Sequence, residues 1–171
     1  MVIRPYRHTD YSHCIAAFDS NCPDFFAYHE KEEFEKLLHD LSLTTQTGDN
    51  SDGVYYYVVE KDNRAVACAG FYLPVDNEDA MLVWGMVARD YHKQGIGEKL
   101  LTFRLEKIQE FRPGARVLLD TTQLSYPFFE RSGFTVSKIT LDFYAQGLDR
   151  YDMVLLPETN IFAKQHRPFL S

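Results

Sequence analysis

Residues 92–98 are the part of this sequence whose residue types and spacing are best suited to chemistry. Two glycines lie here, at the point where an apolar run gives way to a segment with helical periodicity. Glycine has no Cβ, so the backbone can adopt unusual dihedral angles and a ligand can approach it closely. The first N–H groups of a helix lack partners within it, and the helix dipole adds partial positive charge, so a phosphate or pyrophosphate fits there. In order, the residues are His92, Lys93, Gln94, Gly95, Ile96, Gly97 and Glu98.

Two predicted elements hold this loop in place. Residues 80–87 form an apolar run of strand length that is rich in β-branched and aromatic residues, which is typical of a buried strand. A helix that begins near Gly95 and continues to Ile108 would carry two adjacent apolar seams and therefore a wide buried face. The expected unit is strand, tight loop and helix. The seams consist of Ile96, Leu100 and Phe103, and of Leu101, Leu105 and Ile108.

Two familiar phosphate-binding motifs do not match this loop. A dinucleotide-binding turn needs a third glycine three residues after Gly97, and that residue is Leu100. The Gly-Lys-Ser/Thr of a P-loop is also missing from the sequence. Since short glycine motifs match by chance, the loop alone leaves open that its glycines only make a tight connection.

The loop resembles the acyl-CoA-binding signature of the GNAT superfamily of N-acetyltransferases. In that signature a strand ending in Val leads to Arg/Gln-x-x-Gly-x-Gly/Ala at a helix start, and His92 stands here in place of the Arg or Gln. Residues 122–134 are similar to the family's second segment, Asn-x-x-Ala-x-x-Phe-Tyr-x-x-x-Gly-Phe. Phe128, Gly133 and Phe134 match that segment, whereas Thr122, Ser125 and Phe129 replace its Asn, Ala and Tyr.

This resemblance implies an acetyl-CoA site. The strand end at Met86 and Val87 would pair with the pantetheine arm, and the loop would hold the pyrophosphate. The backbone N–H of Val87 or Ala88 would face the developing oxyanion. The residues expected to bind acetyl-CoA, as a co-substrate, are Met86, Val87, Ala88, His92, Lys93, Gln94, Gly95, Ile96, Gly97, Glu98, Thr122, Ser125 and Phe129.

The implied reaction is direct acetyl transfer to a primary amine of a small molecule or peptide. The family's usual Glu and Tyr are missing, because Val83 and Phe129 occupy their positions. Tyr126 is the nearest substitute for the Tyr, since it precedes Phe129 by about one helical turn. Asp120 ends a predicted strand and could accept the proton of the amine. Tyr126 could instead only pack, and Asp120 could instead only cap the turn at residues 121–122.

Those missing groups keep other functions open. An acyl-CoA-binding sensor or structural subunit would need the loop but neither acid nor base. A nucleotide-binding enzyme could use the same loop for a different ligand. The sequence does not identify the amine acceptor.

Composition narrows the class of protein. The 171 residues fit one domain, and 18 Lys and Arg against 25 Asp and Glu give a net charge of −7. This charge argues against nucleic acid and is compatible with a cationic substrate. No apolar segment is long enough for a membrane span, and the N-terminus lacks the apolar core of a signal peptide, so we expect a cytoplasmic protein without membrane contact. The residue spacing indicates neither a disulfide nor a metal site, so we expect reduced thiols at Cys14, Cys22 and Cys68.

The order of predicted elements indicates an α/β (α+β) fold with a mixed sheet of about seven strands and about four helices. We expect one domain over residues 1–171, with a core at 2–156 and a tail at 157–171. The tail carries apolar residues that would pack on this domain or on a second subunit of a homodimer. The polar loop 46–53 is expected to be mobile, and the aromatic connection 23–29 either covers the sheet or forms a substrate wall. Strands are expected at 2–7, 54–60, 65–73, 80–87, 117–121, 135–141 and 150–156, and helices at about 10–20, 31–43, 95–108 and 125–132.

Overall fold

A computed structural model describes residues 1–43 and 53–160 of the chain, and within these ranges seven strands form one mixed sheet in the order β1-β2-β3-β4-β5-β7-β6. Apart from Gly53, the loop at 46–53 lies outside the described residues, and so does the tail beyond Asn160. The strands are β1 (Val2–Pro5), β2 (Val54–Lys61), β3 (Arg64–Tyr72), β4 (Ala80–Val87), β5 (Val117–Thr121), β6 (Thr135–Ala145) and β7 (Leu148–Leu155).

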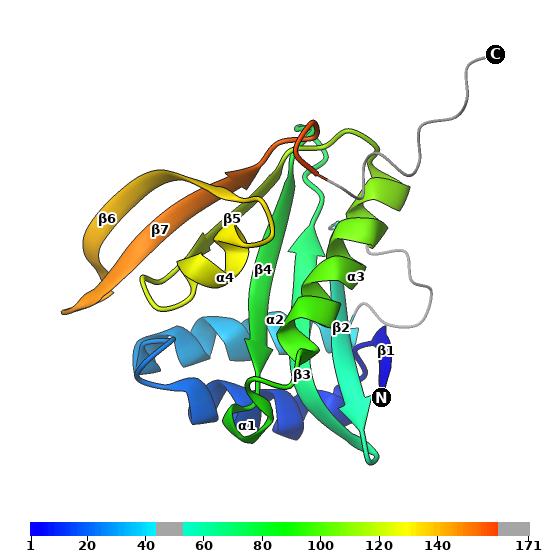
Figure 1. The fold of residues 1–171 in the computed structure, drawn as a ribbon. Coiled ribbons are helices and arrows are strands. Elements are labelled where there is room, and N and C mark those ends of the chain that lie inside the picture. The colour runs from blue at the N-terminus through cyan, green and yellow to red at the C-terminus, as the bar shows by residue number, and fades with distance from the viewer. Residues whose placement is uncertain (44–52, 161–171) are drawn as a thin grey trace.

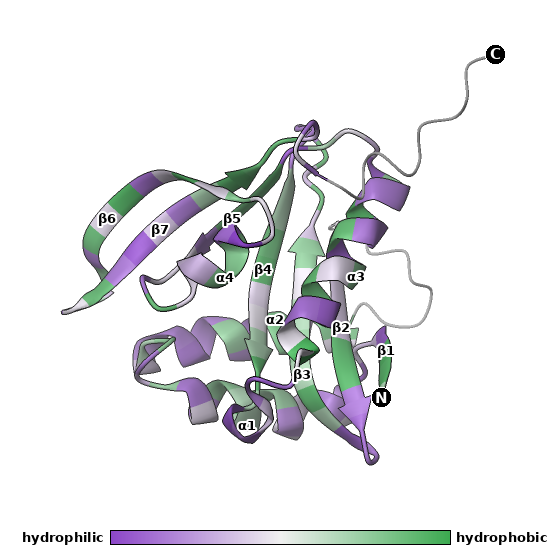
Figure 2. Cartoon of the chain, in the orientation of Figure 1, coloured by the Kyte–Doolittle hydropathy of each residue, from purple (hydrophilic) through white to green (hydrophobic). Residues whose placement is uncertain are grey.

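Helices cover both faces of the sheet (Figure 1). One face packs against α3 and α4, and Leu101, Leu105 and Ile108 of α3 are almost completely buried there. The other face packs against α1 and α2, where Phe18 and Phe34 are fully buried. Figure 2 shows that β2, β3 and β4, which lie between these layers, are largely apolar. The helices are α1 (Tyr11–Asn21), α2 (Lys31–Leu43), α3 (Ile96–Phe111) and α4 (Tyr126–Glu130), with short 3-10 turns η1 (His8–Asp10), η2 (Tyr28–Glu30) and η3 (Arg89–Tyr91).

The sheet opens between β4 and β5. These parallel strands are paired only at Ala80 with Val117 and at Met81 with Leu118, although β4 continues to Val87. Beyond this pairing the two strands diverge (Figure 1). We call this opening the strand gap, and the backbone of β4 that borders it is not paired with β5.

The structure confirms the predicted fold, and the largest correction to a predicted boundary is at the β6–β7 hairpin. The segment 142–149 was expected to be a connection, but β6 and β7 extend through most of it to a tight turn at residues 146–147. Asp142 has φ 51°, its N–H donates to Asp149 Oδ1 at 2.9 Å, and its own Oδ1 accepts from the Gly147 N–H at 2.5 Å. The polar residues that resemble a loop in the sequence therefore form a bulge inside a longer hairpin.

No helix within the described ranges has both the length and the apolar character that crossing a membrane requires.

Candidate active site

The predicted phosphate loop lies at the start of α3 with its backbone open. Gly95 is the N-cap residue and has φ 74°. It has no side chain, so no side-chain hydrogen bond caps the start of α3. A Cβ at Gly95 would meet nothing within 4 Å. The Lys99 N–H donates to Gly95 O at 3.1 Å, so the N–H groups of residues 96–98 precede the first helical hydrogen bond. An anion can therefore reach these N–H groups without displacing a side chain.

The end of β4 is tied to this loop through the Val87 carbonyl. Its oxygen accepts one hydrogen bond from Asn21 Nδ2 and another from His92 Nε2, each at 2.8 Å. His92 thus bonds the strand end. Asn21 is buried at the end of α1, and its contact was not predicted from the sequence because the partner lies 66 residues away.

The two candidate oxyanion donors differ in their surroundings. The Ala88 N–H donates to Val66 O at 2.9 Å, so it is already engaged in the sheet. Val87 faces Ala67 in the antiparallel register, next to that bond, so its own N–H points away from β3 and toward the strand gap. Of the two, Val87 is the donor that a ligand in the gap can reach.

The second family-like segment meets the loop at Gly97. A Cβ at Gly97 would lie 3.7 Å from Phe128 Cζ and 3.7 Å from Val87 Cγ2, so strand, loop and α4 converge there. Thr122 is 4% exposed, and its Oγ1 has no hydrogen-bond partner among the described residues. An unpaired buried hydroxyl is costly unless a ligand completes it. The open loop and this hydroxyl both fit a CoA molecule along the gap.

The other expected CoA contacts in this segment are partly occupied by packing. The Phe129 ring packs edge-to-face on Phe128 and on Phe134, with centroid distances of 5.0 and 5.8 Å. The Ser125 carbonyl accepts the Phe128 N–H at 3.0 Å and so helps to start α4. Both residues are half-buried.

Asp120 lies in a polar group on the opposite face of the sheet from α4. Successive side chains of a strand point to opposite faces of the sheet, and the neighbouring Leu119 belongs to the core beneath α3 and α4. Asp120 therefore points to the other face. The Tyr144 hydroxyl donates to Asp120 Oδ2, and Arg150 Nη2 lies 3.7 Å from Oδ1, so Asp120 is held by β6 and β7. Burial and the bond to Asp120 raise the pKa of Tyr144, which keeps its hydroxyl protonated as a donor.

A second carboxylate reaches the same place from another segment. Glu30 ends η2, is half-buried and accepts the Ala27 N–H at 2.7 Å. Burial raises the pKa of Glu30, and the charge of Asp120 adds to this effect. Sequence reasoning missed Glu30 and Tyr144, because only the fold brings them to the end of β5.

Tyr126, the other candidate catalytic residue, does not lie with Asp120, Tyr144 and Glu30. Its ring stacks on that of Tyr151, with centroids 4.5 Å apart and an angle of 10° between the planes, at the edge of the core beneath α3 and α4. The two candidate catalytic residues therefore flank the sheet on opposite faces near the end of β5. Asp120 faces the α1–α2 side, and Tyr126 faces the side of the glycine loop.

A cleft of about 700 Å³ is lined by residues that follow β5 and Tyr144 in the chain, among them Gln123 and Ala145, although Asp120 and Tyr144 do not themselves line it. One wall is the connection between α1 and α2, and the other is the turn of the β6–β7 hairpin. Gln123 joins this turn to the end of β5, since its Nε2 donates to Gly147 O at 2.6 Å and its Oε1 accepts the Asp149 N–H at 2.9 Å. We call this the acceptor cleft. It is lined by Pro23, Asp24, Ala27, Tyr28, His29, Gln123, Leu124, Ala145, Gln146, Gly147 and Leu148.

In the aromatic connection 23–29, one residue covers the sheet and another lines the cleft. Phe26 packs on Phe18 and on Trp84, at centroid distances of 5.2 and 6.1 Å, and so covers the sheet. Tyr28 is exposed and lines the cleft.

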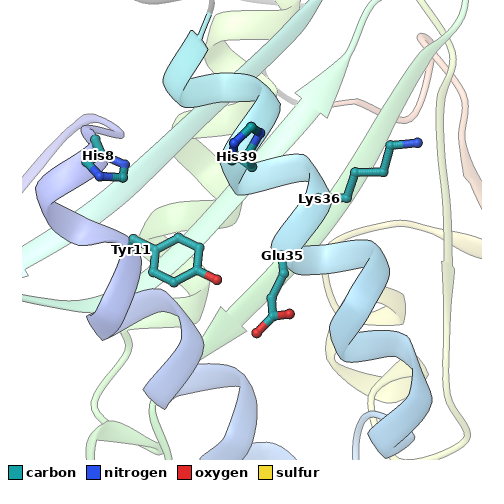
Figure 3. A pocket seen from close by; sticks show the side chains of 5 residues that line it. All are labelled: His8, Tyr11, Glu35, Lys36 and His39. Atoms are coloured by element: carbon teal, nitrogen blue, oxygen red, sulfur yellow. The ribbon is translucent and has the colours of Figure 1, made fainter.

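A pocket of about 360 Å³ lies at the opposite ends of α1 and α2, where the Glu35 carboxylate points toward the Tyr11 ring and Lys36 points away (Figure 3). This pocket is separate from the acceptor cleft, which lies beside the connection that joins the end of α1 to the start of α2.

Fold and site together define a class of enzyme, in which a mixed sheet opens between two parallel strands beside an uncapped helix start. The chain belongs to the acetyltransferase (GNAT) family, whose sequence profile matches residues 15–134. It is accordingly an acyltransferase. No curated protein matches it in sequence.

Solved structures share the fold. A GNAT-family acetyltransferase from Desulfovibrio desulfuricans is 19% identical, with a TM-score of 0.75 over 91% of this chain and 98% of the other. Ribosomal-protein-alanine N-acetyltransferase from Brucella melitensis is 19% identical, with a TM-score of 0.70 over 91% and 99%. An aminoglycoside 6′-N-acetyltransferase in complex with coenzyme A is 13% identical, with a TM-score of 0.66 over 91% and 97%.

Proposed function

We propose that this protein transfers an acetyl group from acetyl-CoA directly to a primary amine of a small molecule or peptide. The observation that carries the proposal is the strand gap, which runs into a helix start whose N–H groups are free of side-chain caps and whose N-cap glycine faces open space. Acetyl-CoA, when bound, supplies an activated thioester. The solved neighbours include enzymes whose names specify amine substrates, which supports the same acceptor chemistry here.

The described residues divide the work of the reaction between the two faces of the sheet. The Val87 N–H points into the gap, where it can stabilise the negative charge that develops on the carbonyl oxygen. Asp120, on the side of the acceptor cleft, accepts the proton of the amine directly or through water. Tyr126, on the side of the glycine loop, is the proposed proton donor to the departing sulfur. The carboxylates of Asp120 and Glu30 near the end of β5 suit an acceptor that arrives as an ammonium ion.

The proposal is tested by measuring thiol release from acetyl-CoA with a panel of amines. The panel contains spermidine, an aminoglycoside, a peptide with an N-terminal alanine, and cationic metabolites. We expect at least one amine to release CoA in step with formation of an N-acetyl product. If CoA binds but no amine releases thiol, the transferase proposal fails.

A second candidate function, an acyl-CoA-binding sensor or structural subunit, is favoured by Val83 and Phe129 at the positions of the family's usual acid and base. Turnover with the amine panel separates the candidates, because a sensor binds acetyl-CoA and releases no thiol with any amine. Competition by ATP or NAD would instead indicate a nucleotide-binding enzyme.

A further inference from the structure

A buried arginine lies against the irregular part of β4. Arg104 of α3 is 4% exposed, its Nη1 donates to Gly70 O at 3.2 Å, and its Nε has no partner among the described residues. A Cβ at Gly85 would lie 3.2 Å from Nη2 and 3.3 Å from Nη1, so the guanidinium packs directly behind the Gly85 backbone. Burial lowers the pKa of Arg104 to about 10, so the group is still a cation at neutral pH.

The backbone in front of this guanidinium is distorted. Trp84 has φ 44°, and the pairing of β3 with β4 shifts register between Cys68 and Gly70, which is a bulge in β4. From the opposite face the Tyr56 hydroxyl donates to Trp84 O at 2.8 Å. The bulge is thus contacted from both faces of the sheet: Tyr56 bonds to Trp84 O on one side, and on the other Arg104 packs behind Gly85 and bonds to Gly70 O of the neighbouring β3.

This position borders the strand gap. Gly85 is exposed, and it lies beyond the last residue of β4 that pairs with β5. It is two residues before Val87, a separation of roughly 7 Å along a strand. A buried cation is screened less by solvent than an exposed one, so its charge can act on groups at this strand end. An isolated buried charge is costly for stability, so a core position alone does not account for it.

We propose that Arg104 is a positioning residue for acetyl transfer, which fixes the bulge of β4 and places a positive charge behind the strand gap. This inference rests on the proposed function. The charge favours the negative oxygen that develops during transfer, and also the thiolate of CoA at the same strand end. Arg104 contacts neither the developing oxygen anion nor the thiolate, because the β4 backbone lies between its guanidinium and the gap.

The test compares Arg104→Met, which keeps length but removes charge, with Arg104→Lys, which keeps charge. Arg112→Met is the matched control, since this arginine ends the same helix and donates to the carbonyls of Pro74, Asn77 and Asp79 at the far end of β4. Acetyl-CoA affinity, kcat with the best amine of the panel and Tm are measured for all variants. The pKa of the bound CoA thiol is followed by thiolate absorbance, which does not depend on turnover.

We expect Arg104→Met to lower kcat at least about tenfold, to raise the pKa of the bound thiol, and to leave acetyl-CoA affinity within about threefold. Arg104→Lys should restore part of both properties, and Arg112→Met should lower Tm alone. If Arg104→Met does not fold, Gly85→Ala provides the test: its Cβ would lie 3.2 Å from Nη2, so the guanidinium must shift by a few tenths of an ångström, and kcat should fall in the same direction.

Wild-type kcat and an unchanged thiol pKa in Arg104→Met would overturn the role of Arg104 and leave the transferase proposal intact. Absence of turnover and of CoA binding in the wild type would overturn both.

Discussion

The glycine loop and the acceptor cleft are built in different ways. The loop is made of backbone from one continuous stretch of about thirty residues, β4 through α3. The cleft is made of side chains from three segments, namely the α1–α2 connection, the end of β5 and the β6–β7 hairpin. The proposed co-substrate site therefore rests on a local motif, whereas the proposed acceptor site depends on how distant segments meet. The variants below test this contrast, from the largest expected effect to the smallest.

The largest effect is expected for Gly95→Val. A side chain there fills the open space at the helix start and prevents the charge-assisted hydrogen bonds of the phosphates, which are worth about 1.5–3 kcal/mol each. Acetyl-CoA affinity should fall on the order of 100-fold in calorimetric titration. Gly114→Val is the control, since Gly114 has φ 80° and equally open surroundings, so both variants pay the same backbone cost of about 1–2 kcal/mol. Equal affinity in the two variants would refute the role of the loop.

Asp120→Asn should be the most damaging single change on the cleft side. Loss of the proton acceptor should lower kcat roughly 10²-fold, with acetyl-CoA affinity nearly intact, because the interaction matters only in the transition state. Asp152→Asn is a matched control: Asp152 faces Asp120 across β5 and β7 and binds the same Arg150 at 2.7 Å. A similar loss in both variants would mean that the ion pairs stabilise the hairpin and that Asp120 takes no proton.

The sequence predicted the fold and the loop because both depend on local patterns. Apolar periodicity located β4 and α3, and the glycine spacing located the turn between them. It did not predict Glu30, Tyr144 or Arg104, because their partners are distant in the chain and meet them only in the fold: Gly70 lies 34 residues from Arg104, and Asp120, the partner of Glu30 and Tyr144, lies 24 residues from Tyr144. Even Asp120, chosen for its place at a strand end, was given no partner by the sequence, and Tyr144 supplies one.

Tyr126→Phe tests the proton donor on the loop side. The phenyl ring keeps the stacking on Tyr151, so a change in kcat reports the lost hydroxyl. We expect a loss of about tenfold, less than the roughly 10²- to 10⁴-fold typical of general acid–base catalysis, because a thiolate can also leave without being protonated. Tyr151→Phe removes the other hydroxyl of the pair and should have no effect on kcat. If both variants turn over like the wild type, Tyr126 serves packing only.

The smallest effect is expected for Lys93→Ala. Lys93 is exposed beside the glycine loop and has φ 60°, and alanine retains a Cβ, so the backbone cost is unchanged. Its charge attracts phosphate through solvent, where screening acts over about 10 Å at 0.1 M salt. Acetyl-CoA affinity should fall a few-fold at low salt, and the difference from the wild type should disappear at about 0.5 M, whereas the effect of Gly95→Val should persist because it depends on shape. Lys138→Ala, an exposed change on β6, serves as the control for total charge. A loss that remains at high salt would show that Lys93 contacts the phosphate directly, and the loop would then depend on side chains as the acceptor cleft does.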